Sequence, residues 1–438
     1  MMFRYAKLLK YCLALILVLI VSVCSPDGKA SDSDYKLTFW SSNNSFEIQH
    51  AREIVSKWNE MHPDLQVKYQ PVPEGRSSEE VILAAIVSKS TPDVYTNIWP
   101  GVMQQYVEAD IMVRLDQFPD FDSLYSTRVP ISLHDKFRSR DGGVYQFPWK
   151  CNPIVIYYNK RMFEDLGIEV PLRTYSEFFQ AAEKLTRDTD DDGYTDQWMM
   201  DVDINTEWWH RFFDFYTMFI AASGGKTFID IDGSIAFDSP AGIQVFDFLR
   251  HGYQKGYFPN AFFQGDVFLQ QKVAVHISGP WNISHLEKYK DDNFEYGFMA
   301  IPVPDDYEGK SFTYGDPKCA GIFKTSKNTG AAWQFLKFML TEQSDKRLLE
   351  ITNQLPIRKN ISRNDNFSGY FKEHPQYNFF ADMIPNIVSV DQSIYLQEMF
   401  DIISQEFDAA CVQGLKSSQE GIRYASERCR SLVRMEEL

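Results

Sequence analysis

Hydrophobic and polar positions alternate with two different periods in the first part of the chain. Residues 37–40 (Leu-Thr-Phe-Trp) form a short apolar run that ends in a polar loop, which is typical of a strand. Residues 48–58 then carry apolar side chains at helical spacing, and residues 65–69 alternate as a second strand. A helix over 79–88 and a strand over 92–95 continue the pattern. This order of strands and helices predicts an open parallel α/β sheet.

The same alternation returns after residue 150. Residues 154–158 are β-branched or aromatic and predict a strand, and residues 176–185 carry the apolar stripe of a helix. A chain of 438 residues is also too long for one compact core. We therefore expect two α/β lobes, with any ligand held at the carboxyl ends of the strands.

The first 23 residues are typical of an export signal. Arg4, Lys7 and Lys10 precede a run of thirteen mostly apolar, uncharged residues, 11–23. Such a run is shorter than the roughly 20 residues that a membrane span needs, but it fits the core of a signal peptide. We therefore expect residues 1–23 to be a signal peptide and the protein to be exported.

The end of this signal carries a cysteine. Residues 21–24 resemble the end of a bacterial lipoprotein signal, in which the cysteine becomes the diacylated first residue of the mature protein. The resemblance implies lipidation of Cys24. Ordinary cleavage nearby is the alternative, because Val23 stands where a small residue is usual. Residues 24–34 are mostly small and polar, which is typical of a flexible tether.

Charge and cysteine content exclude some partners. The formal net charge is −16 at pH 7, and removal of the basic signal leaves the chain more acidic still. With no basic patch, we expect no nucleic-acid partner. No CxxC pair indicates zinc, and a disulfide between Cys411 and Cys429 is left open.

Four blocks of sequence, in order, carry a family resemblance. They are residues 37–73, 143–185, 273–281 (VAVHISGPW) and 319–358. Together they resemble the extracellular solute-binding proteins of family 1, the maltose-binding-like subunits of carbohydrate importers, over about residues 36–360. The resemblance implies a two-lobe periplasmic-binding-protein fold (type II), with discontinuous lobes joined by hinge strands that close over the ligand.

The resemblance also implies how the chain is divided between the lobes. We expect an N-terminal lobe from residues 35–147 and 305–348. We expect a C-terminal lobe from residues 148–304 and 349–438.

A sugar presents hydroxyl edges and apolar faces, so its site needs aromatic rings together with planar polar groups. By the resemblance, Trp281 after the Gly-Pro turn is the strongest candidate for a stacked ring, and core packing is the alternative for this ring and for the others. Trp208 and Trp209 are adjacent, so we expect only one of them to face the cleft. The candidate ligand-binding residues are Trp40, Asn43, Trp99, Trp149, Asn152, Glu207, Trp208, Trp209, Trp281, Tyr314, Asp316 and Arg358.

An acidic turn offers a second candidate site. Residues 188–196 have acids at positions one, three, five and nine and glycine at six, as in the front of an EF-hand calcium loop. The twelfth position is Met199 rather than a bidentate glutamate. A structural calcium ion and a solvated acidic turn are both open, and we expect no required cofactor. The candidate calcium ligands are Asp188, Asp190, Asp192 and Asp196.

These observations favour the substrate-binding subunit of an ABC importer, which binds a sugar or oligosaccharide and delivers it to the membrane permease. We expect a monomer anchored as a lipoprotein, in the periplasm or on the cell surface. The alternatives are a binding protein for another solute, such as glycerol phosphate or a peptide, a secreted glycoside hydrolase and a surface adhesin. No Gly-x-Ser-x-Gly, phosphate loop or HExxH occurs, so we expect no enzyme and assign no catalytic residue.

Overall fold

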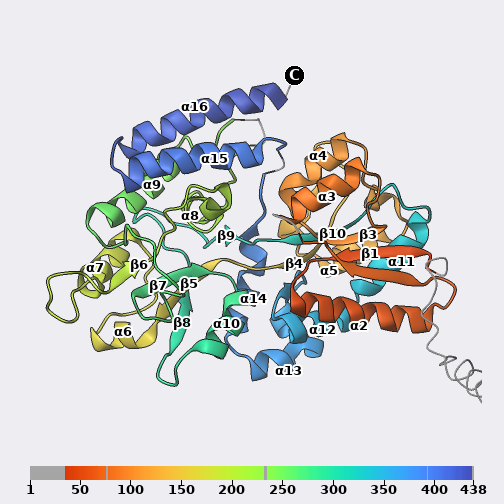
Figure 1. The fold of residues 1–438 in the computed structure, drawn as a ribbon, viewed down its shortest axis with the longest axis horizontal. Helices are drawn as coiled ribbons and strands as arrows, with labels where there is room; N and C mark the ends of the chain where they lie inside the picture. The colour runs from red at the N-terminus through yellow and green to blue at the C-terminus, as the bar shows by residue number, and fades with distance from the viewer. Residues whose placement is uncertain (1–34, 75–76, 231–233, 392, 437–438) are drawn as a thin grey trace, which may run out of the picture.

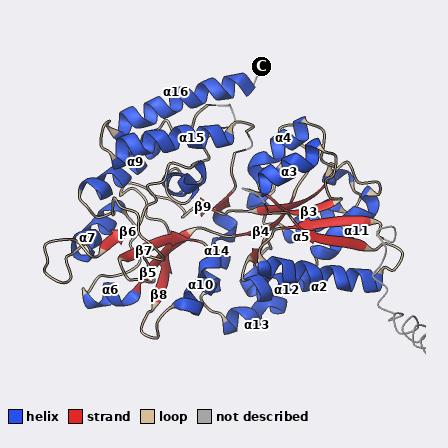
Figure 2. Cartoon of the chain, in the orientation of Figure 1, coloured by secondary structure: helices blue, strands red, loops and turns tan. Residues whose placement is uncertain are grey.

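The structure is a computed structural model that describes residues 35–74, 77–230, 234–391 and 393–436. The predicted signal peptide, the tether and Cys24 lie outside these residues. Two α/β lobes lie side by side, each built on its own sheet (Figure 1). Helices flank both sheets (Figure 2), so the predicted two-lobe α/β fold is confirmed.

The sheet of the first lobe is mixed, with the strand order β11-β4-β10-β3-β1-β2. β1 pairs in parallel with β2 and β3, as the sequence predicts. β10 is antiparallel to β3 and β4, because later parts of the chain return to this sheet from the second lobe. The strands are β1 (Leu37–Ser41), β2 (Val67–Pro71), β3 (Val94–Ile98), β4 (Phe147–Cys151), β10 (Lys318–Ile322) and β11 (Leu355–Pro356).

The helices of the first lobe begin where the sequence supplies caps. The Asn44 side chain accepts hydrogen bonds from the amides of Phe46 and Glu47 and so starts the first helix. That helix buries an apolar stripe which includes Ile54 and Trp58. The helices are α2 (Ser45–Met61), α3 (Ser78–Val87), α4 (Met103–Glu108), α5 (Phe121–Arg128), α11 (Thr329–Met339) and α12 (Glu342–Thr352).

The sheet of the second lobe has the order β6-β7-β5-β8. β6 and β7 are parallel, whereas β5 is antiparallel to both β7 and β8. The strands are β5 (Val155–Asn159), β6 (Trp198–Met200), β7 (Val273–Ser278) and β8 (Tyr296–Met299).

The helices of the second lobe come from the middle and the end of the chain. In α7, Thr174 and Glu177 form a capping box, which explains why this helix begins at Tyr175. Figure 1 shows α15 and α16 packed together on α9, along one edge of this lobe. The helices are α6 (Lys160–Asp165), α7 (Tyr175–Leu185), α8 (Phe215–Ala222), α9 (Pro240–Gln254), α10 (Trp281–Tyr289), α15 (Leu396–Phe407) and α16 (Ser418–Glu436).

The observed strand pairing corrects the expected lobe boundaries. β4 and β11 belong to the first-lobe sheet, although residues 148–304 and 349–438 were expected in the second lobe. The short strands β9 (Thr313–Tyr314) and β12 (Ile387–Val388) pair with each other outside both larger sheets. α13 (Asp365–Glu373) and α14 (Tyr377–Met383) follow β11 and lie between the two lobes (Figure 1). Backbone pairing decides these positions, because each strand must satisfy its buried N–H and C=O groups.

Two further features of the described residues bear on the predictions. Cys151, Cys319, Cys411 and Cys429 are buried free thiols, so the disulfide left open between Cys411 and Cys429 is not formed. None of the helices in the described ranges combines the length and the apolar character of a membrane span.

Candidate interlobe binding site

A pocket of about 700 Å³ opens between the lobes. One wall comes from α3, α4 and the turn that precedes α4, and the other comes from the 3₁₀ turn Trp208–Phe212 and the start of α15. Figure 1 shows α3 and α4 facing the N-terminal end of α15 across this gap. The polar and aromatic lining residues are Ser77, Glu79, Glu80, Trp99, Gln105, Tyr106, Trp208, Trp209, Ser393, Gln397 and Glu398.

Three indole rings meet in this pocket. Trp99 follows β3, and its ring centroid lies 5.8 Å from that of Trp208. Trp209 stands nearly perpendicular to Trp208 and is 47% exposed. The sequence argument expected only one of the adjacent tryptophans to face the cleft, but both line it. The expectation assumed an α-helix at these positions, whereas the two tryptophans begin the short 3₁₀ turn Trp208–Phe212.

A hydrogen-bonded chain below Trp99 joins the two lobes through their connecting segments. Trp99 Nε1 donates to the Tyr314 hydroxyl at 3.4 Å, and that hydroxyl donates to Asp316 Oδ1 at 3.3 Å. Asn152 Nδ2 donates to Asp316 Oδ2 at 3.2 Å. Four residues that the sequence selected from separate regions therefore form one network beneath the pocket.

Lys318 completes the network. Its Nζ lies 3.1 Å from Asp316 Oδ1. Burial by itself lowers the pKa of Lys318, but the carboxylates of Asp316 and Glu79 raise it overall. The lysine therefore stays charged and neutralises Asp316, which holds the floor of the site together.

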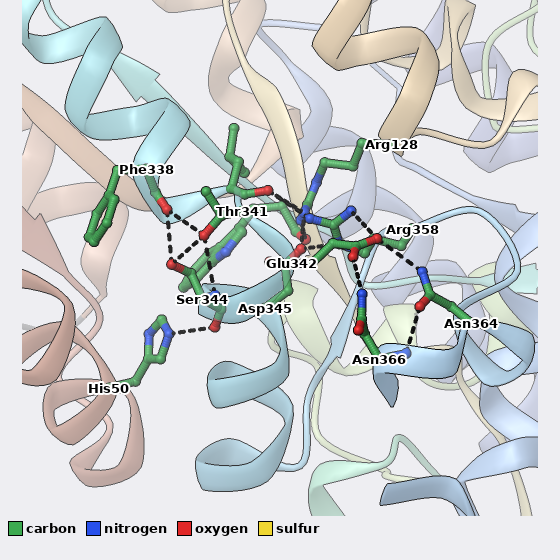
Figure 3. Close-up of polar contacts among 12 residues, drawn as sticks. His50, Arg128, Phe338, Thr341, Glu342, Ser344, Asp345, Arg358, Asn364 and Asn366 are labelled. Atoms are coloured by element: carbon green, nitrogen blue, oxygen red, sulfur yellow. Dashed lines mark hydrogen bonds and ion pairs between the residues drawn. The ribbon is translucent and has the colours of Figure 1, made fainter. Parts of the chain in front are cut away.

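Two candidates lie in the first-lobe core instead of the pocket. Trp149 in β4 is 2% exposed, and its ring faces His50 at a centroid distance of 6.2 Å. Arg358 is buried and pairs with Asp345 of α12 (Figure 3). Its Nη2 also donates to the carbonyl of Leu340 at 2.7 Å. Burial argues against ligand contact by Trp149, and its buried ion pair argues against ligand contact by Arg358.

Arg128 of α5 pairs with the same carboxylate, and both arginines contact its Oδ2 (Figure 3). Burial lowers the pKa of Arg128, whereas the carboxylate opposes this shift. The sequence spacing gives no sign that Arg128 and Arg358 converge on one acid, because their partner lies on a third element.

The remaining four ligand candidates, which include Trp281, do not line this pocket. Trp281 begins α10, is 38% exposed and lies 6.0 Å from Phe213, measured between ring centroids. Glu207 is exposed beside the pocket, and its Oε2 lies 3.7 Å from His210 Nε2. Trp40 is half-buried in β1 against the first-lobe core, and Asn43 is exposed in the loop before α2.

Sequence reasoning missed the carboxylates and amides of the pocket walls. Glu79 and Glu80 lie in the first turn of α3, where acidic residues are common for reasons of helix stability alone. Gln397 and Glu398 lie on α15, beyond the region that carries the family resemblance. Only a fold that places α15 opposite α3 reveals them.

The acidic turn brings three of its four candidate ligands together. One oxygen from each of Asp188, Asp190 and Asp196 lies within 4.8 Å of the others, whereas Asp192 is outside this group. The Asp188 carboxylate accepts the amide of Gly193 at 2.6 Å and those of two further turn residues, and these bonds lower the pKa of Asp188. The donor set fits part of a calcium loop, but backbone amides already hold its first carboxylate.

Two α/β lobes with an aromatic pocket between them define the class of solute-binding proteins. Residues 53–378 match the family described as bacterial extracellular solute-binding protein. The chain belongs to this family.

Curated relatives include several named for saccharides. A maltotriose-binding protein of Pyrococcus abyssi is 23% identical over 313 residues, which cover 70% of this chain and 62% of that protein. The match therefore spans less than two thirds of this relative. A galactooligosaccharide-binding protein of Bacillus subtilis is 24% identical over 406 residues, 88% of this chain and 90% of that protein.

Solved structures share the fold. An uncharacterized protein from Listeria monocytogenes EGD-e has a TM-score of 0.80 and 26% identity, covering 90% of this chain and 100% of its own. The sugar-binding protein MalE of Xanthomonas citri has a TM-score of 0.76 and 17% identity, covering 92% and 98%. The expected two-lobe binding-protein fold is therefore confirmed.

Proposed function

We propose that this protein is the substrate-binding subunit of an ABC importer, which captures a sugar or oligosaccharide between its lobes and delivers it to the membrane permease. The interlobe pocket carries this proposal. Trp208 and Trp209 offer ring faces for a sugar, the buried Trp99 supports Trp208 from behind, and carboxylates and amides on both walls offer partners for hydroxyl groups. The saccharide names of the relatives support the same ligand class.

Export and a lipid anchor at Cys24 complete the proposal. A binding protein of this kind works at the outer face of the membrane, next to its permease. Capture needs no bond cleavage and no cofactor, so addition of EDTA should leave saccharide affinity unchanged.

Isothermal titration and thermal unfolding with maltotriose, galactooligosaccharides and cellotriose test the proposal. A saccharide at about 100 times its Kd adds about 2.7 kcal/mol of stability, which shifts the unfolding midpoint upward. We expect at least one of these saccharides to bind without being hydrolysed. Release of reducing ends would indicate a glycoside hydrolase, and the absence of any binding would refute the proposal.

A pair of variants tests whether the ligand binds in the pocket. Trp209→Ala removes an exposed ring of the pocket wall, and loss of one stacking partner should weaken binding by up to about tenfold. Tyr194→Ala removes an exposed ring of the acidic turn and serves as the control. Equal affinities for the two variants would place the saccharide elsewhere.

A further inference from the structure

The electrostatics of the interlobe pocket go beyond what binding of a neutral sugar requires. Its described lining residues include the carboxylates of Glu79, Glu80 and Glu398 and no lysine, arginine or histidine. Within the described ranges, no ion pair joins these three carboxylates to a basic side chain, although the charges of Glu79 and Lys318 interact and this interaction helps to raise the pKa of Lys318. Glu79 and Glu80 stand on the first-lobe wall, and Glu398 stands on the second-lobe wall.

Two helix N-termini face this pocket, and their partial positive charge opposes the negative charge of the carboxylates. The residues Ser77 to Glu80 start α3, and the residues Leu396 to Glu398 start α15. Each N-terminus is equivalent to about half a positive charge, so the pair offsets roughly one of the three carboxylates. The described lining residues therefore stay acidic overall. Without these acids, the two N-termini would attract anions.

The aromatic lining favours the same sign of ligand charge. The faces of Trp208 and Trp209 carry negative potential, and indole is the best side chain for binding a cation over a ring. A hydroxyl group gains little from this field, whereas an ammonium group gains from both the rings and the carboxylates.

We propose that the pocket selects its saccharide by charge, so that oligosaccharides of amino sugars bind more tightly than neutral sugars of the same shape, and sugar acids are rejected. This inference rests on the proposed function and names the substrate class of the same pocket.

The experiment compares a β-1,4-linked glucosamine trimer with cellotriose, which differs only by hydroxyl groups in place of the amino groups, and with the β-1,4-linked glucuronate trimer, which carries carboxylates on the same backbone. Isothermal titration is run where the amino groups are protonated and again where they are neutral. We expect the protonated trimer to bind at least about tenfold more tightly than cellotriose, and the glucuronate trimer not to bind. The preference should fall when the amines lose their protons, and it should fall with added salt, because part of the pocket is exposed.

Charge-neutral variants locate the effect. A triple variant with Glu79→Gln, Glu80→Gln and Glu398→Gln keeps the side-chain shapes and should reduce the preference to within about threefold. A control with Glu164→Gln, Glu169→Gln and Glu183→Gln changes the net charge equally at exposed positions of the second lobe away from the pocket lining and should keep the preference.

The outcomes separate this inference from the proposed function. If cellotriose or maltotriose binds as tightly as the protonated trimer, or if the pocket variant keeps the preference, selection by charge is wrong while saccharide binding stands. If no saccharide binds, both proposals fail.

Discussion

Replacement of Asp345 by alanine should destabilise the first lobe by about 3–5 kcal/mol. The carboxylate is fully buried and joins Arg128 and Arg358, which are 1% and 9% exposed (Figure 3). Removal of this acid leaves two guanidinium groups uncompensated in the interior. Both arginines still donate to the carbonyl of Leu340, and Arg128 Nη2 also donates to that of Trp149 at 2.8 Å. These bonds place the expected loss near the lower end of the range.

Thermal unfolding followed by circular dichroism measures this loss. At about 2–4 °C per kcal/mol for a lobe of this size, the midpoint should fall by roughly 6–20 °C. Glu53→Ala is the control, because it removes a half-exposed partner of Arg347 and should cost about 1 kcal/mol or less. Equal shifts for the two variants would refute the argument that burial sets the cost.

The ion pairs around Asp345 also determine the role of Arg358. Arg358→Met should lower the unfolding midpoint and leave the affinity of a bound saccharide unchanged in titrations below that midpoint. Loss of binding with unchanged stability would instead restore Arg358 as a ligand contact, as the family resemblance implied.

Three further predictions concern His276, the thiols and the anchor. Burial lowers the pKa of His276, but Asp201, whose carboxylate oxygens lie 3.0 Å from Nδ1, raises it overall above its ordinary value of 6.5. Stabilisation by this pair is fully present below about pH 6.5 and is lost as the pH rises through the folded-state pKa. The difference in unfolding midpoint between the wild type and His276→Gln should therefore shrink above that pH. A difference that stays constant with pH would contradict this prediction. Burial raises the pKa of all four described thiols, that of Cys429 to about 12. A form of the protein that begins at Ser25 should therefore react with a thiol reagent only after unfolding. Reaction in the native state would show that these thiols are accessible. Cys24→Ala should move the protein from the membrane fraction to the soluble fraction of cells, and retention in the membrane would argue against lipidation.

Local pattern predicted much of the fold because the responsible interactions are close in sequence. The helix that begins at Ser45 and the capping box before Tyr175 depend on side chains within a few residues of each other. The lobe boundaries were harder, since β4 and β11 are assigned by pairing partners far away in the chain. Arg358 shows the same limit for the site. Its position after a proline suggested ligand contact, but Asp345 and Arg128 fix its role from other elements.

The pocket itself shows why the site could be predicted only in part. Its indoles come from loops that follow strands or precede helices, where the sequence marks them, whereas Glu398 depends on the packing that places α15 of the second lobe opposite α3. A ligand can favour the closed arrangement only through contacts that it makes with both walls. Trp99 supplies one wall, Trp208 supplies the other, and Tyr314 and Asp316 connect the floor to the segments that join the lobes. Under the proposed function, a saccharide that contacts Trp208 and Trp209 on one wall and α3 on the other would favour closure, and the Trp99 network would connect that contact to the segments that join the lobes.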